Sequence, residues 1–155
     1  MDTDSIIQII AIIILLVMSA FFSSAETAYM TVNKIKIRSL VGKGNKRAAI
    51  VDKIINNSSK MLSTILIGNN IVNLSASTIL TTLVIHLFGN YATGIATGIM
   101  TILVLIFGEI SPKNAATVHA DKIALAYAPV INLLMYLFTP IIFIVDKLSG
   151  GVLRL

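Results

Sequence analysis

The sequence contains no cysteine and only two histidines, His86 and His119. The absence of cysteine excludes disulfides, thiolate metal sites and cysteine nucleophiles. With so little imidazole, metal ligands would have to be side-chain and backbone oxygens, which suit hard cations. No His-Glu-x-x-His, Gly-x-Ser-x-Gly or phosphate-binding Gly-Lys-Ser/Thr motif occurs. We therefore expect a protein that is not an enzyme.

Charged residues are also scarce, at 12% of 155 residues, whereas soluble domains carry roughly a quarter. Hydrophobic residues make up 56% of the chain. This composition predicts an all-α membrane protein built as a single domain, residues 1–155. Asp2 and Asp4 precede the first apolar run in place of the positive charges of a signal peptide, so we expect a retained first span.

Apolar runs and polar interruptions divide the chain into segments. Residues 1–31, 60–87 and 91–113 are each long enough for a transmembrane helix of about 20 residues. Residues 32–59 carry apolar positions at helical spacing around a turn at residues 42–45, which predicts an amphipathic helical hairpin. Residues 121–150 contain Pro129 and Pro140, which favour a break or kink. This last stretch is either a fourth span or a juxtamembrane helix at the interface.

Positive charge is concentrated between the first two spans. Eight basic residues lie from Lys34 to Lys60, against one acidic residue, Asp52. Such a loop is typically cytoplasmic, which predicts a multi-pass plasma-membrane protein with its N-terminus outside and its hairpin inside. A true fourth span would send Lys147 and Arg154 outside, so the charge rule favours the interfacial position and a cytoplasmic C-terminus. Nucleic-acid binding is not expected, because no aromatic residues interleave the charges.

The third span contains a carboxylate, Glu109, inside an apolar helix. A charge at the centre of a span costs roughly 2.5–3.5 kcal/mol on insertion scales, so it marks a functional site by default. Pro112 disfavours helix at Ser111 and removes the usual hydrogen-bond donor of a carbonyl near Gly108. A carboxylate and a freed carbonyl are thereby placed side by side, as a cation requires.

Neutral oxygens recur at helical spacing in the other two spans. Ser19 and Ser23 are four residues apart, as are Asn69 and Asn73, and Asn70 is three residues from Asn73, so each pair shares a helix face. Three helices that bring oxygens to one interior point would form a largely dehydrated site for Mg²⁺.

Each polar residue also has a purely structural interpretation. Serines such as Ser24 back-bond to their own helix, and asparagines hydrogen-bond one helix to another. Glu26 lies near the cytoplasmic end of its span, where it either belongs to the site or pairs with Lys34 or Lys36. A buried Glu109 is harder to explain structurally, because packing does not require a carboxylate.

Three motifs in this order resemble the transmembrane domain of the CNNM/CorC family of magnesium transporters. They are SAFFSSAETA at Ser19–Ala28, IGNNIVN at Ile67–Asn73 and FGEISPK at Phe107–Lys113. The resemblance implies a homodimer of three-span domains within membrane lipid, each with a cytoplasmic hairpin and a final helix that belts the bundle. It also implies magnesium export coupled to sodium entry, with Na⁺ as a second ion.

Carried onto this sequence, the resemblance implies a set of metal ligands: Ser19, Ser23, Asn70, Asn73, the Gly108 carbonyl and Glu109. Further candidates, for metal binding or for structure, are Asn69, Ser24, Glu26 and Pro112. Family members continue into cytoplasmic CBS domains, which are absent here, so nucleotide regulation is not expected of this chain. Two other functions remain open: a magnesium-sensing regulator or scaffold for another transporter, and a sodium-only or nonselective conductance.

Overall fold

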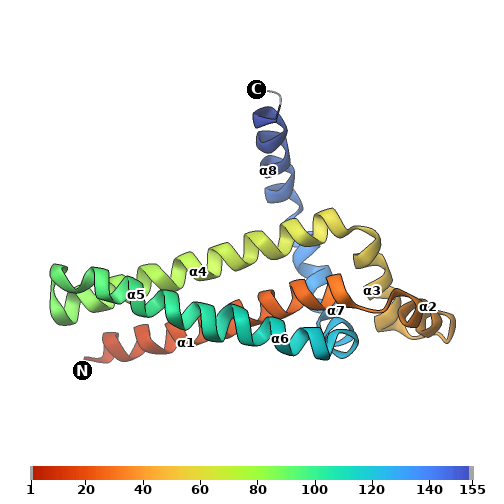
Figure 1. Cartoon of the computed structure of the whole chain (residues 1–155). Coiled ribbons are helices and arrows are strands. Elements are labelled where there is room, and N and C mark those ends of the chain that lie inside the picture. Colours follow the sequence, from red (N-terminus) through yellow and green to blue (C-terminus); the bar gives the residue numbers. More distant parts are fainter. Residues whose placement is uncertain (1, 154–155) are drawn as a thin grey trace.

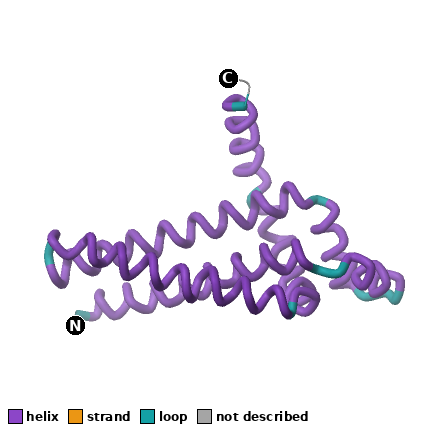
Figure 2. The backbone as a smooth tube through the Cα atoms, in the orientation of Figure 1, coloured by secondary structure: helices purple, strands orange, loops and turns teal. Residues whose placement is uncertain are grey.

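Regular structure in the computed structural model, which describes residues 2–153, is entirely helical (Figure 2). Three long helical units lie side by side: α1 (Thr3–Thr31), α4 (Ser58–Phe88) and a composite third unit (Figure 1). The third unit begins with the 3₁₀ turn η1 (Asn90–Ala92) and α5 (Thr93–Leu103). It continues through the π-helical η2 (Val104–Ile110) into α6 (Ser111–Val118). Successive units run in opposite directions.

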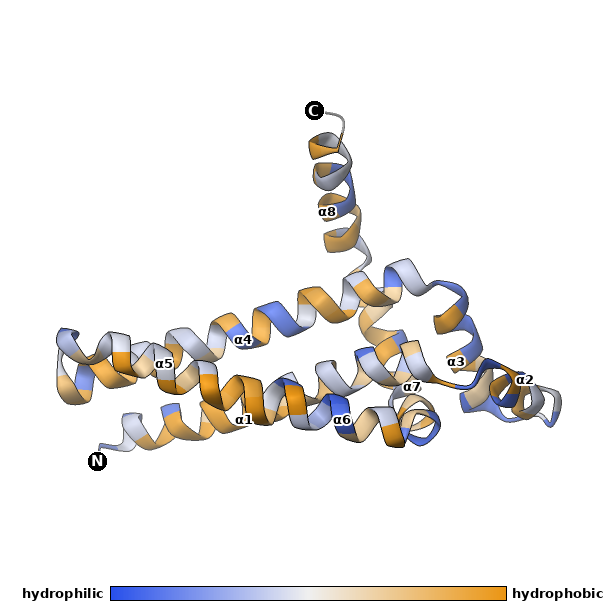
Figure 3. Ribbon diagram, in the orientation of Figure 1, coloured by the Kyte–Doolittle hydropathy of each residue, from blue (hydrophilic) through white to orange (hydrophobic). Residues whose placement is uncertain are grey.

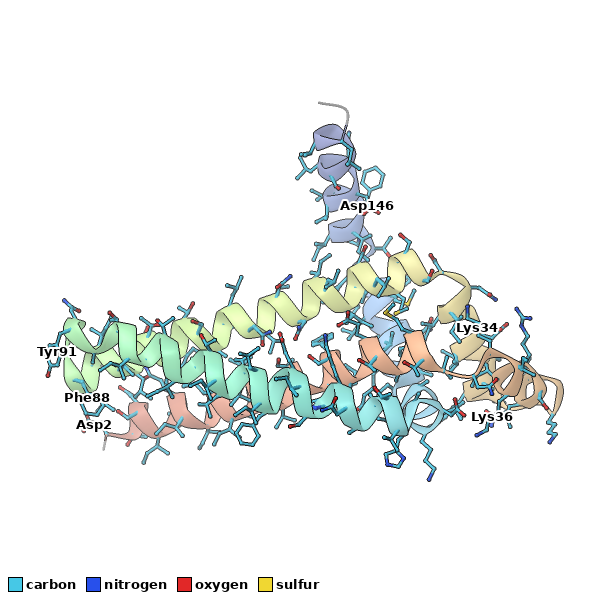
Figure 4. The ribbon with its side chains drawn as sticks, in the orientation of Figure 1. Asp2, Lys34, Lys36, Phe88, Tyr91 and Asp146 are labelled. Atoms are coloured by element: carbon cyan, nitrogen blue, oxygen red, sulfur yellow. The ribbon has the colours of Figure 1, made fainter. Side chains whose placement is uncertain are left out.

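Two short helices, α2 (Lys34–Gly42) and α3 (Lys46–Asn56), join α1 to α4 at one end of the layer (Figure 1). The Asn33 side chain caps α2 by accepting from the Ile35 and Lys36 amides. Gly44 adopts a positive φ of 81° in the turn between the two helices, a conformation that glycine takes without strain. Lys34 and Lys36 mark this basic end in Figure 4, whereas Asp2, Phe88 and Tyr91 mark the opposite end.

The last two helices are α7 (Ala120–Leu137) and α8 (Thr139–Val152). α7 runs across the basic end of the layer and contacts α1, α3 and α4, whereas α8 points away from the bundle (Figure 1). The helix boundary falls at Phe138, just before Pro140. Pro129, in contrast, lies inside α7 without ending it, because buried neighbours such as Ala128 and Ile131 hold that stretch against the core.

The main core lies at the basic end, where α1, α2, α3, α4, α6 and α7 meet. Ile37, Ile54 and Ile131 are fully buried there, and the Tyr29 hydroxyl donates to the Ala124 carbonyl at 2.8 Å. At the far end the core is smaller and includes Ile12. α7 is therefore fixed to the bundle by packing, not only by its connection to α6.

Hydrophobic residues recur along all of the long helices (Figure 3). Large side chains such as Ile13, Leu74 and Ile95 are 56%, 69% and 69% exposed, a surface that soluble proteins rarely present. Among residues 2–153, four helical stretches are long and apolar enough to cross a membrane: Thr3–Thr31, Ser58–Phe88, Asn90–Val118 and Ala120–Leu137. The chain is thus an all-helical membrane protein. The count of three crossings stays a prediction, because α7 also meets this criterion.

Candidate cation site

Three helices meet at a contact between Ser19, Asn69 and Gly108. Ser19 is fully buried, and its hydroxyl donates to the side-chain oxygen Oδ1 of Asn69 at 3.3 Å. A Cβ on Gly108 would lie only 2.7 Å from Ser19 Oγ, so the backbone of η2 touches the serine directly. α1, α4 and η2 therefore meet at one point inside the layer, where α1 and α4 contribute side-chain oxygens.

Two buried oxygens beside this contact have no hydrogen-bond partner among residues 2–153: Ser23 Oγ and Asn73 Oδ1. The side-chain nitrogen Nδ2 of Asn73 donates to Asn69 Oδ1 at 3.4 Å, and the side-chain oxygen of Asn73 accepts no hydrogen bond from residues 2–153. Because α1 and α4 are antiparallel, Ser23 and Asn73 lie one turn from the contact in opposite directions. An unpartnered buried polar group costs about 1–3 kcal/mol, so a cation bound between the helices would stabilise these oxygens.

The third helix passes the contact in π-helical geometry. The Ser111 amide donates five residues back to the Ile106 carbonyl, and Pro112 has no amide hydrogen to donate. The Phe107 carbonyl is left without a donor, because Ser111, its α-helical donor, binds Ile106 and Pro112, its π-helical donor, has no amide hydrogen. The Gly108 carbonyl loses Pro112 as its α-helical donor. The expectation that Pro112 interrupts the helix at Ser111 is wrong, since Ser111 has helical angles of −63° and −45°. A change of register frees the carbonyls instead.

Glu109 lies within η2, directly after Gly108, and its side chain is half-buried. It forms no ion pair with any other described residue. No group of three or more His, Cys, Asp or Glu side chains that could hold a metal occurs in residues 2–153. A cation at this point would therefore be held by one carboxylate and neutral oxygens, a set that Mg²⁺ accepts.

Three other residues that the sequence singled out, Asn70, Ser24 and Pro112, take no part in the contact between Ser19, Asn69 and Gly108. Asn70 is exposed on the single chain, which does not bring it to the Ser19–Asn69 contact. Ser24 donates to the Ala20 carbonyl at 2.7 Å and is satisfied by its own helix. Pro112 borders an apolar hollow that also contains Ser24 and Tyr127. The structure thus groups Asn69 with Asn73 and leaves Asn70 outside.

A shallow, largely apolar hollow extends from Asn73 toward the α4–α5 turn. It has a volume of about 200 Å³ and is bordered by Ser77, Thr97 and Thr101 as well as by apolar residues of α5 and η2. Composition does not separate these hydroxyls from ordinary helix-packing residues, because Thr97 and Thr101 also back-bond to their own helix. Their arrangement around a cavity became visible only in the structure.

An ion pair between α1 and α6 lies on the side of the contact opposite to Asn73. Lys113 Nζ lies 3.3 Å from Glu26 Oε2, and both side chains are partly buried, at 41% and 25% exposure. Glu26 is three residues beyond Ser23, and Lys113 is four residues beyond Glu109. The sequence pointed to Lys34 or Lys36 as partners of Glu26, but Lys36 pairs with Asp121 at 3.0 Å instead. Lys113 could have been found from its position one helical turn after Glu109.

This ion pair predicts an effect on cation affinity. In Glu26→Gln, Lys113 is released and can reach Glu109 one turn away, so Mg²⁺ affinity should fall about fivefold, as for ~1 kcal/mol. In Glu26→Gln/Lys113→Met the competing ammonium is gone, and affinity should return close to that of the unmodified chain. Calorimetric Mg²⁺ titrations of the three proteins measure both changes. Equal affinities of the single and double variants would contradict competition by Lys113.

The fold and the site together define a multi-helix membrane protein with an oxygen-lined site inside its spans. Comparison with known families gives the identity: residues 10–155 match a family model described as the cyclin M (CNNM) transmembrane N-terminal domain. The chain belongs to this family, as its three motifs suggested.

Individual relatives agree with this assignment. The chain is 37% identical over 146 residues to a UPF0053 protein of Haemophilus influenzae, covering 94% of this chain and 35% of the relative. It is 35% identical over 137 residues to the UPF0053 inner membrane protein YfjD of Escherichia coli, covering 88% and 32%. A polyamine export protein of Haemophilus influenzae is 27% identical over 160 residues, covering 95% and 37%. The chain spans about a third of the length of these relatives.

Proposed function

We propose that this chain transports Mg²⁺ across the membrane, as an exporter coupled to Na⁺ entry. The observation that carries the proposal is the pair of unpartnered buried oxygens, Ser23 Oγ and Asn73 Oδ1, on either side of the Ser19–Asn69 contact. In an apolar bundle these oxygens are stabilised best by a cation that passes between the helices.

The proposed ligands at the contact are Ser19, Asn69, Glu109 and the freed carbonyls of η2. Ser23 and Asn73, one turn away in opposite directions, are proposed to bind the ion as it enters or leaves. Mg²⁺ is favoured over softer metals because the set contains only oxygen. A single carboxylate holds the ion without trapping it, since the neutral ligands contribute no net charge. Na⁺ accepts the same oxygens, which is compatible with exchange of the two ions at one site.

Polar groups above and below this site favour transport over simple binding. On one side lies the cavity bordered by Asn73, Ser77 and Thr101. On the other side lie Ser23 and then the Glu26–Lys113 ion pair. Polar groups on both sides of the site would give an ion contacts along the bundle, which supports access from alternate sides of the membrane.

The proposal includes a topology and an assembly. α1, α4 and the η1–α6 unit cross the plasma membrane, the N-terminus is outside, and α2, α3 and the C-terminus are cytoplasmic. The eight basic residues from Lys34 to Lys60 support this orientation. The position of α7 across the basic end of the bundle supports a belt at the interface. Two such chains would form the homodimer, surrounded by lipid.

Two other functions compete with magnesium transport. A magnesium sensor or scaffold would use the same site without moving the ion. Polyamine export is suggested by the name of one relative. A polyamine carries several ammonium groups and needs several carboxylates to hold them. The described part of this bundle offers Glu109 and Glu26 near the site, and Glu26 is already paired with Lys113, which favours a compact ion.

Flux through reconstituted protein separates these functions. Liposomes that contain the purified chain and an internal Mg²⁺ indicator should show Mg²⁺ movement that rises when an opposing Na⁺ gradient is imposed. Liposomes with Glu109→Gln serve as the control and should show no flux above empty vesicles. Mg²⁺ binding without flux would support the sensor, and movement of spermidine without Mg²⁺ would support polyamine export; either result would overturn the proposal.

A further inference from the structure

A groove unrelated to the cation site lies where α3, the start of α4 and the second half of α7 come together. Its volume is about 320 Å³. It combines two ammonium groups, two amide side chains and an apolar wall, and its main lining residues are Lys53, Asn57, Lys60, Asn132, Leu133 and Tyr136. This mixture is not explained by helix packing, which would fill the space with apolar side chains.

The groove is positively charged. No acidic residue lines it, and neither Lys53 nor Lys60 forms an ion pair with another residue of the described chain. Asp146 on α8 (Figure 4) lines an adjacent hollow together with Lys60, and Asp52 precedes Lys53 on α3. Asp146 lies beyond salt-bridge distance of Lys60, so both ammonium groups are free to bind an anion.

Apolar side chains surround the charged groove. Leu133, Tyr136 and Leu137 on α7 are 55%, 77% and 54% exposed, and Phe143 on α8 is 67% exposed. Tyrosine is enriched at membrane interfaces, where its ring and hydroxyl face different surroundings. A soluble phosphate would use the lysines and leave this apolar rim uncovered. A phospholipid would use both, with its headgroup in the groove and its acyl chains along α7.

We propose that this groove binds the headgroup of an anionic phospholipid. Basic pockets between helices at the cytoplasmic face of a membrane are suited to such headgroups. Lys53 and Lys60 bind the phosphate, and Asn57 and Asn132 donate to its oxygens or to the glycerol. Because the groove is formed by α3, α4 and α7 together, the bound lipid links α7 to the rest of the bundle and stabilises its transverse position.

The test compares two variants that remove the same amount of charge. Lys53→Gln/Lys60→Gln alters the groove, whereas Lys43→Gln/Lys46→Gln alters two lysines near the α2–α3 turn that line neither hollow. Each protein is placed in phosphatidylcholine nanodiscs with or without phosphatidylglycerol, and bound lipid is counted by native mass spectrometry. Mg²⁺-induced stabilisation is recorded in parallel to show that each variant is folded.

The unmodified chain and the turn variant should retain phosphatidylglycerol in preference to phosphatidylcholine. The groove variant should lose this preference, with affinity reduced roughly fivefold for each lysine and thus about 25-fold in total. Equal retention by the groove variant, or equal loss in both variants, would overturn the proposal. Displacement of phosphatidylglycerol by free glycerophosphate would overturn it as well, because it would assign the groove to a soluble phosphate.

Discussion

Glu109→Gln is expected to abolish the stabilisation of the protein by Mg²⁺. Glutamine keeps the size and one carbonyl oxygen of the side chain, but it removes the carboxylate of the residue that directly follows Gly108 in η2. Breaking a buried charge pair costs about 3–5 kcal/mol, which corresponds to a loss of roughly 150- to 5,000-fold in affinity. The Mg²⁺-induced rise in melting temperature should therefore disappear at concentrations that saturate the unmodified chain.

Asp146→Asn provides the matched control for this experiment. It removes one carboxylate from α8 (Figure 4), which borders the start of α4 at Lys60 and not the Ser19–Gly108 contact. Its Mg²⁺-induced shift should equal that of the unmodified chain. A shift that persists in Glu109→Gln would remove Glu109 from the site, and a shift lost equally in both variants would indicate a general effect of charge.

Gly108→Ala should be strongly damaging for so small a substitution. The added Cβ would lie 2.7 Å from Ser19 Oγ and 3.3 Å from Ser19 Cβ, both inside normal contact distance. α1 and η2 would have to separate, and overpacking of this kind costs about 1–3 kcal/mol. The separation also moves Ser19 and Glu109 apart, so both the melting temperature and the Mg²⁺-induced shift should fall.

Gly98→Ala is the control for helix propensity. Gly98 lies in α5 on the same helical unit, and a Cβ there would meet nothing within 4 Å. This variant should be neutral or stabilised by up to about 1 kcal/mol, the usual preference for alanine over glycine within a helix. If both alanine variants behave alike, close contact between Gly108 and Ser19 is not what fixes this site.

The sequence predicted the helical architecture well because hydrophobic length and charge act locally. An apolar run such as residues 60–87 has few options other than a long helix, and α4 extends over Ser58–Phe88. The turn expected at residues 42–45 coincides with the end of α2 and the start of α3, since Gly44 and Asn45 are strong turn formers. What the sequence left open is whether α7 crosses the membrane.

The details of the site were harder to predict, because they depend on how each helix is rotated. Asn69 and Asn70 are neighbours, and periodicity alone does not show which of them faces α1. Packing determines the rotation: Gly68 lies so close to the Phe22 ring that a Cβ there would be 2.4 Å from it. This contact turns Asn69 toward Ser19 and leaves Asn70 exposed. Tertiary contacts of this kind are not encoded in a single helix.

The register of the third helix was equally inaccessible from the sequence. Pro112 indicated correctly that a carbonyl loses its donor, but a proline does not reveal whether the helix breaks or changes register. The contact between Gly108 and Ser19 places the backbone of η2 against α1, where a break would leave several buried amides unpaired. The π-helical turn avoids this by keeping most amides bonded while freeing the Phe107 carbonyl.

The most direct test of the central claim is a structure of the protein determined with Mg²⁺. The account predicts an ion between α1, α4 and η2, about 2.0–2.1 Å from a Glu109 oxygen and from oxygens of Ser19 or Ser23 and of Asn69 or Asn73. Glu109→Gln crystallised under the same conditions should lack this ion. An ion bound elsewhere, or one that keeps its full shell of water and touches none of these residues, would contradict the account.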